Sequence, residues 1–394
     1  MNAERTDWRL VWLCIGAGIV GALQIGKAPP VILDIERDLG LTKVEAGWAI
    51  SLISAVGVTL APFSGILTGM LGARRVHLAG YLIIAAGSLL GMSAAGAGSL
   101  FAGRIFESLG FLALIVAVPP MLQRASTAID QHRVMAYWGG YMPVGMVIAL
   151  VTAPLIADLV GWRGLWGVIV AVTLTWGLLM MVRLPADAAR GGPPPDRRAV
   201  FATFRRPAVW LLPAVFCVYN IQWMSVMGWL PSVLEDGFGL TGQAAAMLTA
   251  LPIAVNATIN MIAGRLMQAG MPRWWLMAFA SSVMALSALG IFDEGLDAGL
   301  RYALVVAFGG FGGLIPASLF ALAPRTVARN EQLGVVNGLL VQGSHAGQLA
   351  GPPLAAAIAI AFGGWNASLW LMLGAAAVTM SLIAIVRVME RRTA

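Results

Sequence analysis

Long apolar segments, each interrupted by only a few polar residues, recur along the whole chain of 394 residues. A helix needs roughly 20 mostly apolar residues to cross the hydrocarbon core of a bilayer. The strands of a membrane β-barrel would be about 10 residues long with alternating polarity, and these segments are too long and too uniformly apolar for that. The pattern therefore predicts an all-α integral membrane protein with twelve transmembrane helices. They are expected at residues 10–31, 45–69, 76–97, 99–122, 135–158, 163–184, 208–230, 242–265, 273–292, 301–322, 335–360 and 367–389.

The longest polar interruption, residues 183–207, contains prolines, glycines and six arginines, and it predicts a linker after the sixth helix. It divides the chain into an N-terminal six-helix bundle at residues 1–182 and a C-terminal six-helix bundle at residues 208–394. Short sequences recur in the two halves at offsets of 199 and 203 residues. The matching positions are Gly40-Leu41-Thr42 with Gly239-Leu240-Thr241, Gly65 with Gly264, Gly140 with Gly343 and Trp162 with Trp365. Parallel six-helix repeats are a construction of secondary transporters, which bind substrate between the halves near the midplane. Thr42 and Glu45 also have the spacing of a capping box, at the start of the second helix.

The charge distribution is that of a membrane protein. Charged residues make up 11% of the chain, against about 25% in soluble domains. The net charge of +7 would suit a nucleic-acid partner, but with a cytoplasmic N-terminus 19 of the 25 Lys and Arg residues fall on cytoplasmic segments. This asymmetry predicts a multi-pass protein of the bacterial inner membrane with both termini and the linker in the cytoplasm, and no nucleic-acid partner. Trp162 and Trp166 are expected at a membrane edge, where an indole is half hydrated.

Three charged residues fall well inside the predicted helices, away from their ends, and they share one depth. By the rise of 1.5 Å per residue, Lys27 lies roughly 9 Å below the outer edge, Arg104 roughly 8 Å and Glu107 roughly 12 Å. Lys27 has three possible roles: snorkelling to the headgroups, a structural pair with Glu107, or direct contact with a substrate. Arg104 is either a structural tie to backbone carbonyls of the first helix or a fork-shaped ligand for a planar carboxylate. Together the three groups carry a charge of +1, which favours an anionic substrate.

Other polar residues fall near the predicted midplane. Isolated amides in membrane helices more often join helices than bind ligands, although polar side chains also tend to face a cavity. A neutral, hydrogen-bonded ring is the favoured state of His345, which could otherwise titrate near neutral pH. The further candidates for a substrate site are Gln24, Tyr137, Tyr141, Asn220, Gln222, Asn256, Asn260, Gln342 and His345.

The sequence lacks the residue combinations that catalysis would require. The predicted spans hold no paired His, Asp or Glu constellation of the kind that catalysis requires. A phosphate-binding G-x-x-x-x-G-K-[ST] loop is also absent from the sequence. Met142 and Met146 lie one turn apart, but packing explains a methionine pair better than a metal does. We therefore predict no enzyme activity, no cofactor and no metal.

Several motifs resemble those of the major facilitator superfamily. The stretch GILTGMLGARRVHL at residues 65–78 is similar to the superfamily's signature loop, which the resemblance identifies as a gating element. The matching positions of that loop are Gly65, Leu67, Gly72, Arg74 and Arg75. The acidic and basic positions of the signature are here Gly69 and Met70, so the charged gate of the family is altered. Arg104 in GRIFESLGF resembles the arginine of the helix-four motif, and residues 139–154 resemble the glycine–proline motif of helix five.

The resemblance implies two pseudo-symmetric six-helix bundles, a monomer, and a central cavity lined by the first and fourth helices. Residues 228–252 and 337–353 are similar to the cyanate-permease-like branch, which includes cyanate and nitroimidazole transporters. We predict a secondary active transporter that moves a small solute, preferably a small organic anion, by alternating access, with a proton as a candidate co-transported ion. The alternatives are a multidrug or metabolite efflux carrier and, from another class, a membrane-embedded sensor or enzyme.

The predicted orientation can be tested by thiol labelling in intact cells. Single cysteines are placed at Gly192 and at Asp236, after both native cysteines have been replaced. An impermeant reagent should label the cysteine at 236 and not the one at 192, because the charge asymmetry puts the linker inside. Permeabilised cells, in which both sites should react, serve as the control. Labelling at 192 alone in intact cells would show that the protein has the opposite orientation.

Overall fold

Helices account for all the regular secondary structure in the residues that the structure describes, which are 5–63, 68, 70–185, 204, 207–293, 295–326 and 333–393. In this computed structural model, ten described segments are long and apolar enough to cross a membrane. One of them, Arg133–Arg183, contains two of the predicted helices, which meet at the non-helical Gly161 with φ of +70°. The predicted helix 335–360 is α17 (Leu333–Ala361), whose polar residues keep its hydropathy below that of the ten. Each of the twelve predicted segments therefore contains helix.

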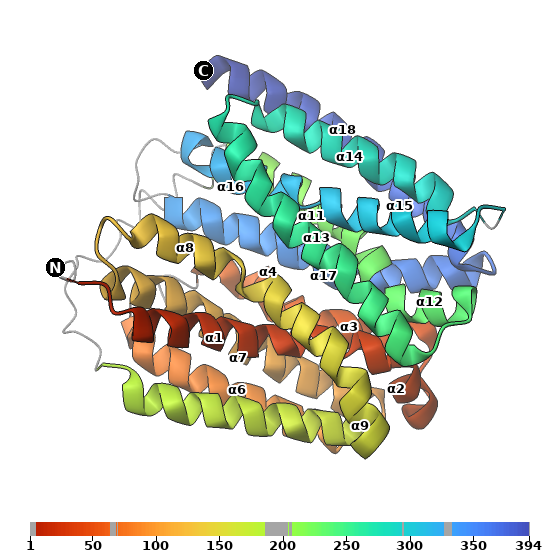
Figure 1. The fold of residues 1–394 in the computed structure, drawn as a ribbon, viewed down its shortest axis with the longest axis horizontal. Coiled ribbons are helices and arrows are strands. Elements are labelled where there is room, and N and C mark those ends of the chain that lie inside the picture. The colour runs from red at the N-terminus through yellow and green to blue at the C-terminus, as the bar shows by residue number, and fades with distance from the viewer. Residues whose placement is uncertain are drawn as a thin grey trace. The chain divides into compact units, whose positions relative to one another are not determined.

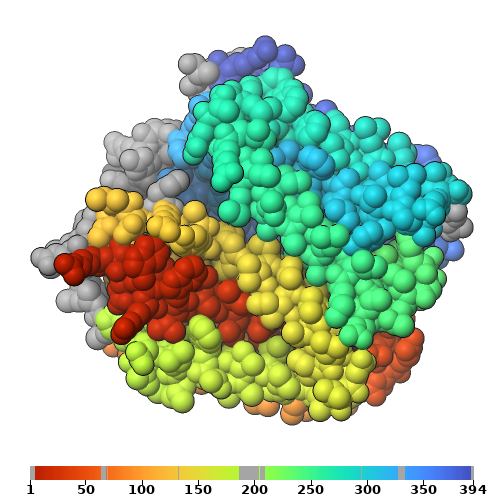
Figure 2. All heavy atoms as spheres, in the orientation of Figure 1, coloured from red at the N-terminus to blue at the C-terminus, as the bar shows by residue number. Residues whose placement is uncertain are grey.

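The described residues form two compact units, one within residues 1–41 and 63–194 and the other within 42–62 and 195–394. The first unit contains α1 (Trp8–Gly26), η1 (Pro29–Val31), α2 (Ile32–Leu39), α6 (Ala73–Met92), α7 (Ala97–Ala125), α8 (Gln131–Gly139) and α9 (Tyr141–Arg183). Within it α7 runs beside α6 and also contacts α1 (Figure 1). Figure 2 shows the red residues of α1 next to the yellow and yellow-green residues of α9 on one face of this unit.

The second unit contains the remaining helices. They are α3 (Lys43–Ser51), η2 (Leu52–Ser54), α4 (Ala55–Leu60), α11 (Pro207–Met227), α12 (Leu230–Phe238), α13 (Gly242–Gln268), α14 (Arg273–Ile291), α15 (Ala298–Phe311), α16 (Leu314–Leu322), η4 (Ala323–Thr326), α17, η6 (Trp365–Ala367) and α18 (Ser368–Thr393). The turn η3 (Ala61–Phe63) lies at the boundary between the two units. Residues 42–62 belong here because α3 and α4 pack along α17. Glycines allow this contact, since a Cβ added at Gly47 would lie 2.9 Å from the Cα of Pro353. The boundaries of the two bundles at 182 and 208 stay a prediction, since most of the linker lies outside the described residues.

The first predicted helix differs from its expected extent. It was expected to continue to residue 31, but α1 ends at Gly26, and η1 and α2 follow it. Pro29 and Pro30 explain the break, because proline lacks the backbone N–H that would continue the ladder and restricts the residue before it. The end of α1 therefore falls at Lys27, its C-cap residue.

The internal repeat is visible in the backbone. Gly40 ends α2 with φ of 62° and ψ of 35°, and Gly239 ends α12 with φ of 64° and ψ of 27°. Two residues later, Thr42 and Thr241 each cap the following helix by accepting a hydrogen bond from the third residue on. The predicted capping box of Thr42 and Glu45 is confirmed. The same left-handed turn followed by the same cap thus occurs once in each half of the sequence.

Helices α6 and α7 meet backbone to backbone at a row of glycines. A Cβ added at Gly103 would lie 2.7 Å from the carbonyl oxygen of Gly87 and 2.8 Å from the amide nitrogen of Gly91. A Cβ at Gly110 would lie 2.6 Å from the carbonyl oxygen of Gly80. Small residues allow membrane helices to approach this closely. The close crossing is what brings side chains of α6 next to those of α7 in the interior of the first unit.

We expect Gly103→Ala to destabilise the protein by about 1–3 kcal/mol, because the added methyl must push the two helices apart. Gly98→Ala on the same helix is the matched control, since no atom lies within 4 Å of its added Cβ. Thermal unfolding of both purified variants in detergent measures the difference. Equal melting temperatures for the two variants would show that the crossing is not close-packed.

Candidate functional site

Lys27 lies at the end of α1 with its side chain fully buried. Its ammonium group donates to the Oε1 of Gln24 at 2.6 Å, to the Oγ of Ser88 at 3.0 Å and to the Oε1 of Glu107 at 2.7 Å. An ammonium has three N–H donors, so each has an acceptor. Because Lys27 is 0% exposed, it does not snorkel to a headgroup in this structure. The pair with Glu107 that equal depth predicts is present.

Arg104 and Glu107 lie one turn apart on α7 and complete the cluster. The Nη1 of Arg104 donates to the Oε2 of Glu107 at 2.6 Å and to the carbonyl oxygen of Gln24 at 2.9 Å. That carbonyl lies in the last turn of α1, where the helix leaves carbonyls without an intrahelical partner. A cation there is also favoured by the helix dipole. Arg104 therefore ties the end of α1 to α7, which is one of the two roles that the sequence left open.

Three further side chains of the cluster are not among the sequence-based candidates. Ser88 of α6 donates to the Oε1 of Glu107 at 2.6 Å. Thr173 of α9 accepts a hydrogen bond from the Nε2 of Gln24 at 3.3 Å. The ring of Trp166, also on α9, lies with its centroid 4.5 Å from the Nζ of Lys27. Trp166 is 0% exposed, so its expected place at a half-hydrated membrane edge is wrong. It makes a T-shaped contact with Trp162, which lies one helical turn earlier on α9.

The cluster therefore joins α1, α6, α7 and α9 by side-chain contacts and by one bond to the carbonyl oxygen of Gln24. Its two bases, Lys27 and Arg104, both form ion pairs with one acid, Glu107. The formal charge of +1 is held in a region shielded from water, since all three side chains are at most 1% exposed. A buried charge is strongly unfavourable unless it is paired. This arrangement can accept one further negative group without any excess of negative charge.

Two predicted tyrosines of the first unit lie away from this cluster. The Tyr137 ring stacks on Trp12 at 5.3 Å, and its hydroxyl accepts a hydrogen bond from the Nε of Arg133. Tyr141 stacks on Trp138 at 4.2 Å. Both aromatic rings of that second pair face Gly18 of α1, which lies roughly 13 Å along the helix from Lys27 by the helical rise. The structure does not bring these tyrosines to the charged site.

In the second unit, polar residues of α17 face the broken helix at residues 52–60. Gln342 donates to the carbonyl oxygen of Val58 at 2.6 Å, and Ser54 donates to Gln348 at 2.9 Å. Between them, the buried ring of His345 packs on Gly57, and its Nδ1 has no hydrogen-bond partner in the described part of the chain. This row of contacts follows a spacing of three residues along α17.

The remaining predicted amides also join helices of the second unit. Asn220 of α11 donates to the Oγ of Ser344 at 3.2 Å. Gln222 donates to the carbonyl oxygen of Met372 at 3.0 Å, and Asn256 to that of Gly309 at 2.6 Å. Asn260 is half-buried on α13. Three of these four amides thus have the interhelical role that is usual for isolated amides in membrane helices.

Of the predicted gating loop, Gly65, Leu67 and Gly69 lie outside the described residues. Gly72 precedes α6 with φ of 89°. Arg74 donates from Nη2 to the carbonyl oxygen of Met181 near the end of α9 at 2.9 Å, and Arg75 is exposed. The described part of this loop therefore fastens the start of α6 to α9.

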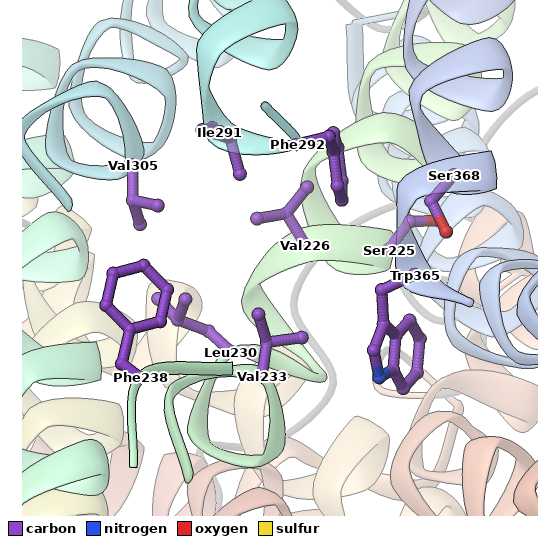
Figure 3. Close-up of a pocket in the computed structure, with 10 residues that line it drawn as sticks. All are labelled: Ser225, Val226, Leu230, Val233, Phe238, Ile291, Phe292, Val305, Trp365 and Ser368. Atoms are coloured by element: carbon purple, nitrogen blue, oxygen red, sulfur yellow. The ribbon is translucent and has the colours of Figure 1, made fainter. Parts of the chain in front are cut away.

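A small pocket in the second unit is lined by eight apolar side chains and two serines (Figure 3). The lining residues are Ser225, Val226, Leu230, Val233, Phe238, Ile291, Phe292, Val305, Trp365 and Ser368. None of the sequence-based candidates is among them. Within the described residues, no group of three or more His, Cys, Asp or Glu side chains is arranged to hold a metal ion.

An all-helical membrane protein with an internal repeat and a buried charged cluster has the general plan of a secondary transporter. The model of the Major Facilitator Superfamily matches residues 13–340, and the chain belongs to this superfamily. The superfamily expected from the sequence motifs is thus confirmed. The protein is a multi-pass membrane transporter and not an enzyme, whereas its place in the cyanate-permease-like branch stays a prediction.

Several relatives match most of the chain, among them the two described next. The "Nitrite extrusion protein" of Bacillus subtilis (strain 168) is 24% identical over 369 residues, which are 90% of this chain and 87% of that protein. "Monocarboxylate transporter 3" of Rattus norvegicus is 27% identical over 371 residues, 87% of this chain and 73% of that protein. A crystal structure of a bacterial homolog to the human lysosomal transporter Spinster, in an inward-facing and occupied conformation, has a TM-score of 0.80. It is 14% identical and covers 100% of this chain and 97% of its own, which supports the shared fold.

The charge arrangement predicts unequal losses of stability. Glu107→Gln leaves two buried bases without their shared carboxylate, and it should lower the free energy of unfolding by about 3–5 kcal/mol. Lys27→Met leaves Arg104 paired with Glu107, so its loss should be smaller. Thermal unfolding in detergent compares both with Lys43→Met, which removes the other lysine of the chain. The charge argument fails if Lys27→Met is the more damaging of the two.

Proposed function

We propose that the protein is a secondary transporter of small organic anions that works by alternating access. The observation that carries this proposal is the buried cluster in which Lys27 and Arg104 share the single carboxylate of Glu107. An anion that enters this cluster would meet an ammonium and a guanidinium that are already desolvated. Hydrogen bonds to charged partners are the strong ones, and they strengthen further where water is absent.

The geometry favours a planar anion with two oxygens on one atom. The guanidinium fork of Arg104 matches such a group, and in this structure the two oxygens of the Glu107 carboxylate accept from different bases, Oε1 from Lys27 and Oε2 from the Nη1 of Arg104. The names of two relatives refer to anions of this shape, since nitrite and a monocarboxylate each carry two oxygens on one central atom. We therefore take small monocarboxylates and nitrite as the candidate substrates.

A proton is the natural co-substrate in this scheme. The carboxylate of Glu107 must release the two bases before an external anion can take its place. Protonation of Glu107 would weaken both ion pairs, and the arriving anion would then restore the charge balance of the cluster. One proton and one anion would move together, and the site would return to its present state after their release.

The proposed setting follows from the sequence and the family. We place the protein in a bacterial inner membrane with both termini in the cytoplasm, because of the distribution of its basic residues. A monomer is sufficient, since each group of the cluster comes from a single chain. Rocking of two six-helix halves would expose the site to each side in turn.

Transport by the purified protein in liposomes tests this function. Labelled formate should exchange across the membrane of wild-type proteoliposomes, and an acidic exterior should accelerate its uptake because a proton moves with it. Lys27→Ala should reduce the initial rate at least about tenfold, a loss of 1.4 kcal/mol or more. Lys27→Arg tests geometry, because a guanidinium does not replace a point charge.

The chain offers a matched control in its second lysine. Lys43 lies in the other unit, 5.6 Å from the ring of Trp365, so Lys43→Ala should transport at the wild-type rate. Nitrite and lactate are assayed in the same way, and a lipophilic cation is included as a representative efflux substrate. If wild-type protein moves the cation and none of the three anions, the protein is an efflux carrier and the anion proposal is wrong.

A further inference from the structure

Trp166 differs from Trp176, a half-buried tryptophan on the same helix, in the use of its indole N–H. Its Nε1 is buried and has no hydrogen-bond partner among the described residues. By contrast, the Nε1 of Trp176 on the same helix donates to the carbonyl oxygen of Leu13 at 3.3 Å. A buried indole N–H usually finds a partner, and each unsatisfied group in a folded protein needs an explanation.

The unpaired N–H belongs to the ring that holds Lys27. The Nζ of Lys27 lies over the face of this ring, 4.5 Å from the centroid. Such a cation–π contact fixes the ammonium while leaving the edge of the ring available. The Trp166 side chain therefore has two separate parts, a face that positions a base and an edge with a free donor.

The surroundings of this edge place it at the crossing of α6 and α7. A Cβ added at Gly91 of α6 would lie 2.9 Å from the Nε1 of Trp166, so the edge rests on a residue without a side chain. Gly91 in turn contacts Gly103 of α7, and Arg104 is the next residue. The N–H without a partner thus lies at the glycine crossing of α6 and α7, where Arg104 follows Gly103 along α7.

The protein acceptors of the cluster are already engaged. The Oε1 of Glu107 accepts from Lys27 and Ser88, and its Oε2 accepts from Arg104. The Oε1 of Gln24 accepts from Lys27, and its carbonyl oxygen accepts from Arg104. None of these oxygens accepts a hydrogen bond from the Nε1 of Trp166, and a ligand oxygen would supply an acceptor.

We propose that the indole N–H of Trp166 is an anion-binding group that donates to one oxygen of a transported carboxylate while Lys27 and Arg104 bind the charge. This inference rests on the proposed function and adds a neutral, directional donor to the two bases. A carboxylate has lone pairs enough to accept from all three groups at once. In this structure that donor has no partner among the described residues, and the bound anion would accept its hydrogen bond.

Trp166→Phe is the decisive variant, because it keeps an aromatic face for Lys27 and removes the N–H together with one ring of the indole. Trp176→Phe loses the same ring. Binding of sodium formate to purified protein is measured by calorimetry, with sodium chloride as the salt control. The dissociation constant should rise about ten- to hundredfold, as expected for a lost hydrogen bond to a charged partner. Trp176→Phe is the matched control on the same helix and should bind formate within about twofold of wild type, because its N–H bonds a backbone carbonyl.

A second measurement uses wild-type protein and does not depend on the variant's stability. The indole ¹⁵N–H signals are recorded during a formate titration, with the Trp166 signal assigned by its loss in Trp166→Phe or, if that variant does not fold, in Trp166→Tyr. The Trp166 proton should move downfield as the new hydrogen bond forms, while the Trp176 proton stays in place. A merely structural role for the ring would leave both signals unmoved.

The possible failures are distinguishable. If wild-type protein binds formate but Trp166→Phe binds it equally well and the Trp166 signal stays still, the inference is wrong and anion transport stands. If wild-type protein binds neither formate nor nitrite, the proposed function falls, and this inference falls with it.

Discussion

An ammonium ion inside a membrane helix bundle must find in the protein the solvation that water would otherwise provide, and this requirement organises the first unit. Lys27 obtains it from three oxygen acceptors and one aromatic face. Those groups come from four helices, so each helix has to be positioned accurately enough for its group to reach the ammonium. The glycines of α6 and α7 allow the approach that brings Ser88 to Glu107. The end of α1 at two prolines supplies both Lys27 and the carbonyl that receives Arg104.

Part of this cluster was predictable from the sequence, and the reason is the helical rise. Depth along a helix follows from residue number, so Lys27, Arg104 and Glu107 could be placed at one level and paired by charge. Ser88, Thr173 and Trp166 could not, because a hydroxyl or an indole within an apolar segment has no charge that must be compensated. The rotation of each helix about its axis was also unknown. Trp166 was therefore expected at a half-hydrated membrane edge, whereas its side chain is buried.

The twelve helices and the internal repeat could be predicted from the sequence for a different reason. Hydrophobic length and the turn chemistry of Gly40 and Thr42 are local properties, and the same turn at Gly239 and Thr241 confirms them. Which helices pack together is not local. The sequence assigns residues 45–62 to the first bundle by order alone, and that assignment stays a prediction. The glycine and hydroxyl contacts that these residues make with α17 depend on segments far apart in the chain. The order of the helices along the chain does not tell which of them pack together.

The pairing of residues 42–62 with α17 sets an order of events during biosynthesis. Ser54 and Gln348, which form one of its hydrogen bonds, are 294 residues apart in the chain. At translation rates of 5–20 residues per second, the ribosome delivers the second partner about 15–60 s after the first. Throughout that interval the earlier helix, with its 3₁₀ turn at Leu52–Ser54, stands in the bilayer before its own partner exists. Lipid cannot satisfy the groups that α17 later bonds. The second unit is thus completed from its earliest helix and one of its last, and a chain interrupted before α17 leaves that helix exposed to quality control.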